Sequence, residues 1–228
     1  MNQEAATIDR LVRVPAGRAV LEGQLTLPAS AAGVVLFAHG SGSGRHSPRN
    51  QHVARLLREA RLGTLLIDLL TAEEEAIDRR SAKLRFDIGL LAERLAAAIH
   101  WLAHEPETTA LAIGLFGAST GAGAALVAAA DLPECVAAVV SRGGRPDLAG
   151  PALARVRAPT LLIVGGNDTP VIPLNQQALA RIQADKDLVI VPGASHLFEE
   201  PGTLDEVAHL ARTWFTRYLN LTDIQETP

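Results

Sequence analysis

Six short runs of largely apolar residues restrict the fold of this chain more than any other feature of its sequence. They cover residues 34–38, 64–67, 110–116, 136–140, 160–164 and 188–191. Runs of this length and composition suit strands that are buried on both faces of a parallel sheet. We therefore expect a sheet whose strands are joined by helical crossovers rather than by tight hairpins.

The segment before these runs has a different pattern. Residues 21–27 alternate between apolar and polar side chains and end at Pro28, which predicts a half-buried antiparallel strand. Val12 and Val14 are expected to pair with it across a turn at residues 15–17. The sheet should thus begin with an antiparallel pair.

Two long segments between or after the runs carry an apolar residue at every third or fourth position, as an amphipathic helix does. The first stripe consists of Leu84, Ile88, Leu91, Leu95, Ile99 and Leu102, and the second of Leu204, Val207, Leu210, Ala211, Trp214 and Tyr218. Alternating strands and helices predict an α/β fold with a doubly wound, mostly parallel sheet. No repeat or linker interrupts the pattern, so we expect one domain over residues 1–228.

Composition excludes several classes of function. A net charge of −4, spread along the chain, gives no basic surface for nucleic acid or an anionic membrane. The single cysteine, Cys135, precludes an intrachain disulfide and fits a reducing compartment. The charged N-terminus does not resemble a signal peptide, and no apolar run is long enough to cross a bilayer. We expect a cytoplasmic protein. The sequence does not determine its oligomeric state, and a homo-oligomer is compatible with it.

The glycine-rich stretch GASTGAG admits two interpretations. Gly117, Gly121 and Gly123 have the glycine spacing with which short-chain dehydrogenases hold a dinucleotide, whereas Gly117, Ser119 and Gly121 form the G-x-S-x-G turn of a nucleophilic serine. A dinucleotide motif belongs to the first strand–helix unit, but these glycines follow the third of the buried runs. The dehydrogenases also need Tyr-x-x-x-Lys, and no lysine follows the only tyrosine, Tyr218. The sequence favours the nucleophile.

A serine nucleophile needs a base, and the base needs a carboxylate that fixes its tautomer. Asp168 lies in the loop after the run 160–164, and His196 lies in the loop after the run 188–191. Both loops are expected at the carboxyl edge of the sheet, where sites in such folds lie. We predict that Ser119, Asp168 and His196 form a catalytic triad.

An oxyanion hole requires backbone N–H groups from the residue after the nucleophile and from the loop after an earlier strand. Thr120 supplies the first. The second is expected from the glycine-rich loop at residues 39–44, called the oxyanion loop below, with Ser41 as the donor and Gly42 next to the substrate. His39 is expected to shape this loop through hydrogen bonds rather than to act as a second base.

The chain resembles the α/β-hydrolases, and among them the small, cap-poor members related to dienelactone hydrolase. The resemblance extends from HGSGSGRHSPRN through GASTG and GGND to PGASHLF and so covers essentially the whole chain. It implies a sheet of about eight strands and no large cap domain. The enzyme that gives the group its name has a cysteine nucleophile, so the serine at position 119 favours ordinary serine esterase chemistry.

Three further features of the sequence bear on other functions. His100 and His104 are four residues apart on one helix, but two ligands make an incomplete metal site, and we expect no metal. The HGSGSGR loop lacks the G-K-[ST] ending of a phosphate-binding loop. Arg142 follows the run 136–140; it either clamps a substrate carboxylate or ties down the loop around Asp147, and we favour the second slightly.

The function predicted from these residues is a serine hydrolase for a small carboxylic ester or lactone, with no cofactor. Two alternatives stay open: a non-catalytic ligand-binding protein of the same fold, and an acyltransferase or perhydrolase that uses the same triad. The segments that could cover the site, residues 69–83 and 141–158, are short and the first is rich in charge. We therefore expect a shallow site that prefers short acyl groups.

Overall fold

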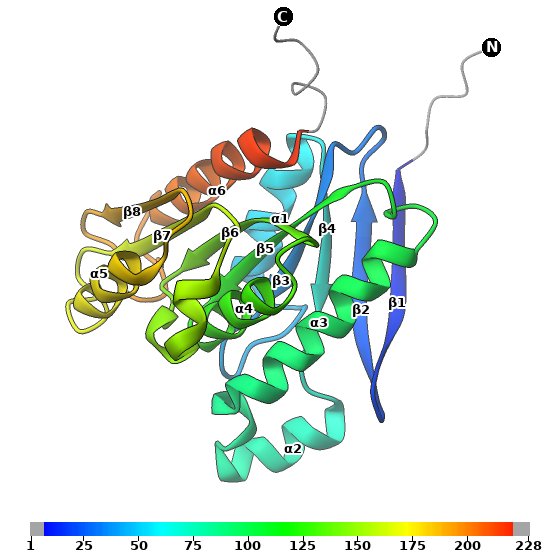
Figure 1. Cartoon of the computed structure of the whole chain (residues 1–228), viewed down its shortest axis with the longest axis horizontal. Coiled ribbons are helices and arrows are strands. Elements are labelled where there is room, and N and C mark those ends of the chain that lie inside the picture. Colours follow the sequence, from blue (N-terminus) through cyan, green and yellow to red (C-terminus); the bar gives the residue numbers. More distant parts are fainter. Residues whose placement is uncertain (1–6, 221–228) are drawn as a thin grey trace, which may run out of the picture.

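A computed structural model describes residues 7–220 of the chain and has one eight-stranded sheet at its centre (Figure 1). The strands are β1 (Ile8–Ala16), β2 (Ala19–Leu27), β3 (Gly33–Ala38), β4 (Leu62–Ile67), β5 (Ala112–Ala118), β6 (Val136–Arg142), β7 (Thr160–Gly165) and β8 (Lys186–Val191). All six apolar runs and the predicted antiparallel pair therefore correspond to strands.

The strand order in the sheet is β1-β2-β4-β3-β5-β6-β7-β8. β1 pairs with β2, and β2 with β4, in antiparallel fashion, and every later pairing is parallel. The central strands β3, β4 and β7 are buried along their whole length, as continuous apolar runs predict. The predicted doubly wound, mostly parallel α/β sheet is confirmed.

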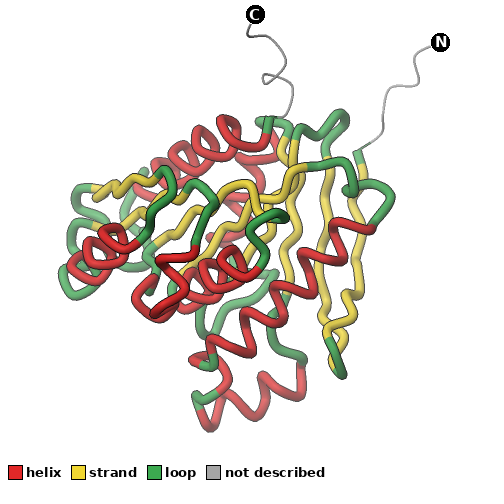
Figure 2. Tube along the Cα trace, in the orientation of Figure 1, coloured by secondary structure: helices red, strands yellow, loops and turns green. Residues whose placement is uncertain are grey.

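Helices cover both faces of the sheet (Figure 2). They are α1 (Pro48–Glu59), α2 (Ala72–Ser81), α3 (Ile88–His104), α4 (Thr120–Asp131), α5 (Ile172–Arg181) and α6 (Thr203–Leu219), with 3₁₀ segments η1 (Leu84–Phe86) and η2 (Pro146–Arg155). α1 and α6 pack on one face, and α3, α4 and α5 pack on the other. The parallel strands thus end at a single edge that neither layer covers.

The predicted helix over residues 84–102 is wrong at its start. Leu84 belongs to the separate segment η1, and α3 begins only after Asp87, whose side chain accepts a hydrogen bond from the amide of Leu90 at 3.0 Å. The buried carboxylate of Asp78 accepts the amides of Leu84 and Arg85, which turns the chain away from the helix axis. The hydrogen bonds from these two amides to the side chain of Asp78 replace the helical ones, so the helix does not extend to Leu84 despite the apolar periodicity.

Neither segment that could cover the site forms a large cap. α2 and η1 make up a short helical cover (residues 72–86, the cover segment), which projects beyond the sheet edge in Figure 1, and residues 146–155 form only 3₁₀ turns. No helix within residues 7–220 combines the length and the hydropathy that a membrane span requires. The sheet edge that carries the candidate residues is therefore covered only on one side.

Candidate active site

Ser119 occupies the turn between β5 and α4 in a strained conformation. Its φ of 50° and ψ of −123° lie in a region that non-glycine residues rarely adopt. The turn lifts the side chain out of the sheet edge, and Ser119 is half-buried. This is the backbone geometry of a nucleophile elbow.

The two glycines of G-x-S-x-G are required by the packing of this turn. A Cβ atom on Gly121 would lie 2.2 Å from the carbonyl oxygen of Ala38, and one on Gly117 would lie 2.5 Å from Cα of Ala122. Both contacts are with backbone atoms that cannot move aside. The strand, the turn and the helix can approach this closely only because neither position has a side chain.

Asp168 and His196 are brought together from the loops after β7 and β8. Oδ2 of Asp168 accepts a hydrogen bond from Nδ1 of His196 at 2.6 Å. Asp168 is buried, with 9% of its surface exposed, whereas His196 is partly exposed. A carboxylate in this position orients the ring and keeps its proton on Nδ1, so that Nε2 is available as a base.

Two loop contacts hold this pair in place. The side-chain amide of Asn167 donates to the carbonyl of Gly193 at 2.8 Å, which ties the aspartate loop to the histidine loop. Glu200 accepts the amide of Ser195 at 2.9 Å, next to His196. Hydrogen bonds from Ser195 and the local backbone lower the pKa of Glu200, so its carboxylate stays charged and continues to accept them.

The end of β6 connects the nucleophile with the histidine. The amide of Ser119 donates to the carbonyl of Arg142 at 3.4 Å. A Cβ atom on Gly143 would lie 2.8 Å from the carbonyl oxygen of His196, so that loop rests directly on this glycine. No hydrogen bond joins Ser119 to His196 within the described residues; such bonds are often long before substrate binds.

The two predicted oxyanion donors also meet. Oγ of Ser41 and Oγ1 of Thr120 are 3.2 Å apart, which places the oxyanion loop beside the start of α4. Within residues 7–220, the backbone amides of Ser41 and Thr120 donate no hydrogen bond to another backbone group. Both are free to receive an anion, and Thr120 stands at the positive end of a helix.

His39 shapes the oxyanion loop as expected. Nδ1 donates to the carbonyl of Gly40 at 2.9 Å, and Nε2 accepts the amide of Leu69 at 2.9 Å. Burial lowers the pKa of His39 below its ordinary value, so the ring is neutral at pH 7. Both nitrogens are therefore used in holding the loop.

Arg142 does not tie down the loop around Asp147. That carboxylate accepts two hydrogen bonds from Arg145, at 2.8 and 2.7 Å, so the interpretation we favoured is wrong. Arg142 is buried with 7% of its surface exposed, its Nε has no hydrogen-bond partner, and it forms no ion pair within the described residues. Burial, together with the positive charge of Arg49, lowers the pKa of Arg142 to about 10.

A cavity of about 400 Å³ lies between the oxyanion loop and the cover segment. Gly42, the predicted substrate contact, lines it, and Arg142 does not. The remaining lining residues are His39, Gly40, Ser41, Ser43, Gly44, His46, Ser47, Pro48, Arg49, Asp68, Leu70, Glu75, Asp78, Arg79, Arg85, Leu91 and Thr120. The predicted charged cover is therefore one wall of the cavity beside the candidate oxyanion hole.

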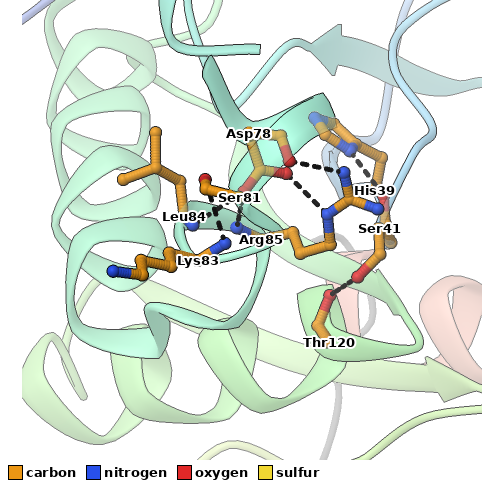
Figure 3. A network of polar contacts seen from close by, with 9 residues as sticks. His39, Ser41, Asp78, Ser81, Lys83, Leu84, Arg85 and Thr120 are labelled. Atoms are coloured by element: carbon orange, nitrogen blue, oxygen red, sulfur yellow. Dashed lines mark hydrogen bonds and ion pairs between the residues drawn. The ribbon is translucent and has the colours of Figure 1, made fainter. Parts of the chain in front are cut away.

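Sequence reasoning missed the polar residues that support this cavity. Asp68 accepts the backbone amide of Arg45 at 2.6 Å and pairs with its guanidinium, which anchors the far end of the oxyanion loop. Asp78 pairs with Arg85 at 2.6 Å (Figure 3). The only signal for either pair was an acid and a base on neighbouring loops, and many surface residues share that pattern.

The sequence profile of the Dienelactone hydrolase family matches residues 58–222. The chain belongs to the dienelactone hydrolase family. A crystal structure of dienelactone hydrolase from Anabaena variabilis superposes with a TM-score of 0.92 at 62% sequence identity, covering 93% of this chain and 99% of that chain.

Two further comparisons place this family member among its relatives. A lid-less α/β serine hydrolase of Xanthomonas campestris shares the fold, with a TM-score of 0.74, 21% identity and full coverage of both chains. Two proteins of Mycobacterium tuberculosis, provisionally named phosphoribosyl transferases, are 59% identical over 211 residues, or 92% of this chain. The chain spans about half of their length (47%).

Proposed function

We propose that this member of the dienelactone hydrolase family is a serine hydrolase that cleaves small carboxylic esters or lactones through an acyl-enzyme. The hydrogen bond between His196 and Asp168, on the loops that flank the strained turn of Ser119, carries the proposal. A buried carboxylate paired with a partly exposed imidazole beside a serine is the arrangement that activates a hydroxyl.

In the proposed reaction, Oγ of Ser119 attacks the carbonyl carbon while Nε2 of His196 takes its proton. The negative oxygen of the tetrahedral intermediate accepts hydrogen bonds from the amides of Ser41 and Thr120. His196 then gives the proton to the departing alkoxide, and Asp168 stabilises the imidazolium throughout. Water repeats the same steps on the acyl-enzyme and releases the acid.

The size and lining of the cavity support small substrates. A volume of about 400 Å³ is at the low end of the range for ligand sites, which is about 300–1,000 Å³. The main aliphatic side chains on its walls are Leu70 and Leu91, and several charged groups surround them. Gly42 is proposed to lie beside the bound acyl group; Arg142 is proposed as a contact for a substrate carboxylate only where one reaches beyond this cavity.

A fluorophosphonate probe tests the proposal, because it labels only an activated serine. We expect labelling of the wild type and hydrolysis of p-nitrophenyl acetate, both abolished in Ser119→Ala. Ser81→Ala, which removes an exposed hydroxyl of α2 that does not line the cavity, is the matched control and should keep both. Labelling and turnover that survive in Ser119→Ala would refute the nucleophile assignment.

The same assay separates the alternatives. A ligand-binding protein of this fold would bind esters without labelling and without turnover. An acyltransferase would label, but would release p-nitrophenol at a substantial rate only when an acceptor alcohol or amine is added, and would form the new ester or amide in place of the acid. No contact within the described residues favours phosphoribosyl transfer, the reaction named for relatives about twice as long as the matched segment.

A further inference from the structure

The cavity lies on one side of the candidate nucleophile only. Its walls are the oxyanion loop, Thr120 and elements that precede α4 in the chain. Among the described residues, none that follows Thr120 lines it, so the loops of Asp168 and His196 lie outside. This asymmetry determines which part of an ester can occupy the cavity.

The geometry of acyl transfer determines whether the acyl group or the alcohol of an ester occupies the cavity. The departing oxygen must lie within hydrogen-bond reach of His196, which protonates it, and the oxyanion must point to the amides of Ser41 and Thr120. The acyl carbon chain takes the remaining direction, away from His196 and past the oxyanion loop. The cavity beside that loop therefore receives the acyl group, while the alcohol lies on the uncovered side.

The cover segment contributes four side chains to the lining of this cavity, those of Glu75, Asp78, Arg79 and Arg85. Arg85 is the basic one among them that hydrogen bonds hold in place. Its Nε donates to Oδ2 of Asp78 at 2.6 Å, and its Nη2 donates to the carbonyl of Asp78 at 3.0 Å. Nη1 makes no hydrogen bond within residues 7–220. Figure 3 shows the guanidinium reaching from η1 toward the side of the cavity where His39 and Ser41 lie.

The ion pair with Asp78 fixes both the position and the character of this donor. The carboxylate of Asp78 is almost fully buried and also accepts the amides of Leu84 and Arg85, so the guanidinium is held at several points. Because Asp78 balances its charge, Arg85 offers the cavity a hydrogen bond rather than an uncompensated positive charge. Asp68, which also lines the cavity, is balanced by Arg45 in the same way, and Glu75 and Arg79, one turn apart on α2, contribute opposite charges.

We propose that this cavity is the acyl subsite and that Arg85 determines its specificity, selecting uncharged acyl groups that carry an ether or hydroxyl oxygen near the carbonyl. The proposal rests on the hydrolase function proposed above. A purely aliphatic acyl group of the same size would leave Nη1 without a partner in a partly desolvated site, which is unfavourable. The alcohol portion, by contrast, is recognised by few contacts.

Pairs of isosteric esters test the selection. p-Nitrophenyl methoxyacetate and butyrate differ by one ether oxygen in place of a methylene, as do the 3-methoxypropionate and the pentanoate. Each kcat/KM ratio is divided by the ratio of alkaline hydrolysis rates, which removes intrinsic reactivity. In the wild type we expect a corrected preference of about tenfold for the ether in at least one pair, the value of one hydrogen bond to a charged donor.

Two variants link that preference to Arg85. Arg85→Lys keeps a positive charge for Asp78 but removes the second donor, and should reduce the corrected preference at least fivefold, chiefly through KM. Arg80→Met changes an exposed arginine of the same cover segment, on α2, that does not line the cavity, and should leave the preference unchanged. Thermal unfolding verifies that both variants are folded.

The outcomes are distinguishable. A corrected wild-type ratio near one in both pairs overturns the proposal without any variant, as does an unchanged preference in folded Arg85→Lys. Strong dependence of kcat/KM on the alcohol in methyl, butyl and hexyl butyrates would overturn the assignment of the cavity to the acyl group. If no ester is hydrolysed in a Ser119-dependent manner, the hydrolase function itself fails.

Discussion

Replacing Arg142 by methionine should stabilise the protein. The arginine is 7% exposed and forms no ion pair within the described residues. The positive charge of Arg49 repels it. Buried charges without a partner are costly, whereas a long apolar side chain keeps the packing of the stem. The usual expectation, that changing a buried residue destabilises a protein, is therefore reversed here.

The pKa gives the size of the effect. Burial lowers the pKa of Arg142 to about 10, roughly two units below the ordinary value of a guanidinium. Each pKa unit corresponds to about 1.4 kcal/mol, so the charged form costs the folded state on the order of 3 kcal/mol. Because the folded-state pKa is the lower one, this cost is present in full at pH 7 and declines as the pH rises through 10.

Urea denaturation at pH 7 measures the free energy of unfolding of both proteins. We expect Arg142→Met to raise the free energy of unfolding by about 1–3 kcal/mol. The gain can fall below the upper value because methionine does not fill the space of the guanidinium. Arg145→Met is the control of opposite sign: its hydrogen bonds to Asp147 raise the pKa of Arg145, so removing it should cost up to about 1 kcal/mol. A loss of more than about 1 kcal/mol in Arg142→Met would show that the arginine makes a stabilising contact, and would refute the reasoning.

Four further predictions concern the site. Asp168→Asn should remain folded but lower kcat on the order of 10⁴-fold, since the amide no longer holds the imidazole tautomer; a near-normal rate would exclude Asp168 as the acid. kcat/KM on p-nitrophenyl alkyl esters should fall once the acyl chain exceeds a few carbons, and a long-chain preference would contradict the small cavity. The lowered pKa of His39 means that stability is lost as the pH falls below about 6.5, the unfolded-state value, and His39→Gln should show a smaller loss in urea titrations. Asp78→Asn should loosen the cover segment, so trypsin should cut after Arg79 faster than in the wild type, and equal cutting rates would contradict its role as an anchor.

Much of the fold follows from local patterns. Five of the six apolar runs correspond to largely buried strands, because a strand buried on both faces needs apolar side chains at every position. The sixth forms the edge strand β8, in which only Val191 is buried. The turn at Ser119 was also predictable, since glycine is the one residue that fits at Gly117 and Gly121.

The cover segment and the role of Arg142 were not predictable from periodicity. The start of α3 depends on where the carboxylates of Asp78 and Asp87 find amide partners, and the first of these is six residues away from Leu84. The partner of Asp147 is its near neighbour Arg145 rather than Arg142. Such competitions between nearby charged groups are decided by side-chain geometry, which composition and spacing do not encode.

Asp78 holds the cover segment together, Glu74 ties it to Arg94 of α3, and Ser119, Asp168 and His196 all lie on other loops. Substitutions at positions of residues 72–86 other than Glu74 and Asp78 are therefore expected to leave the chemical step unchanged. Lineages that diverge in this stretch would acquire new substrates while retaining the same reaction. Exchanging the cover segment between homologues would change one side of the cavity lining and leave Ser119, Asp168 and His196 in place. We expect such exchanges to alter substrate selectivity without changing the reaction.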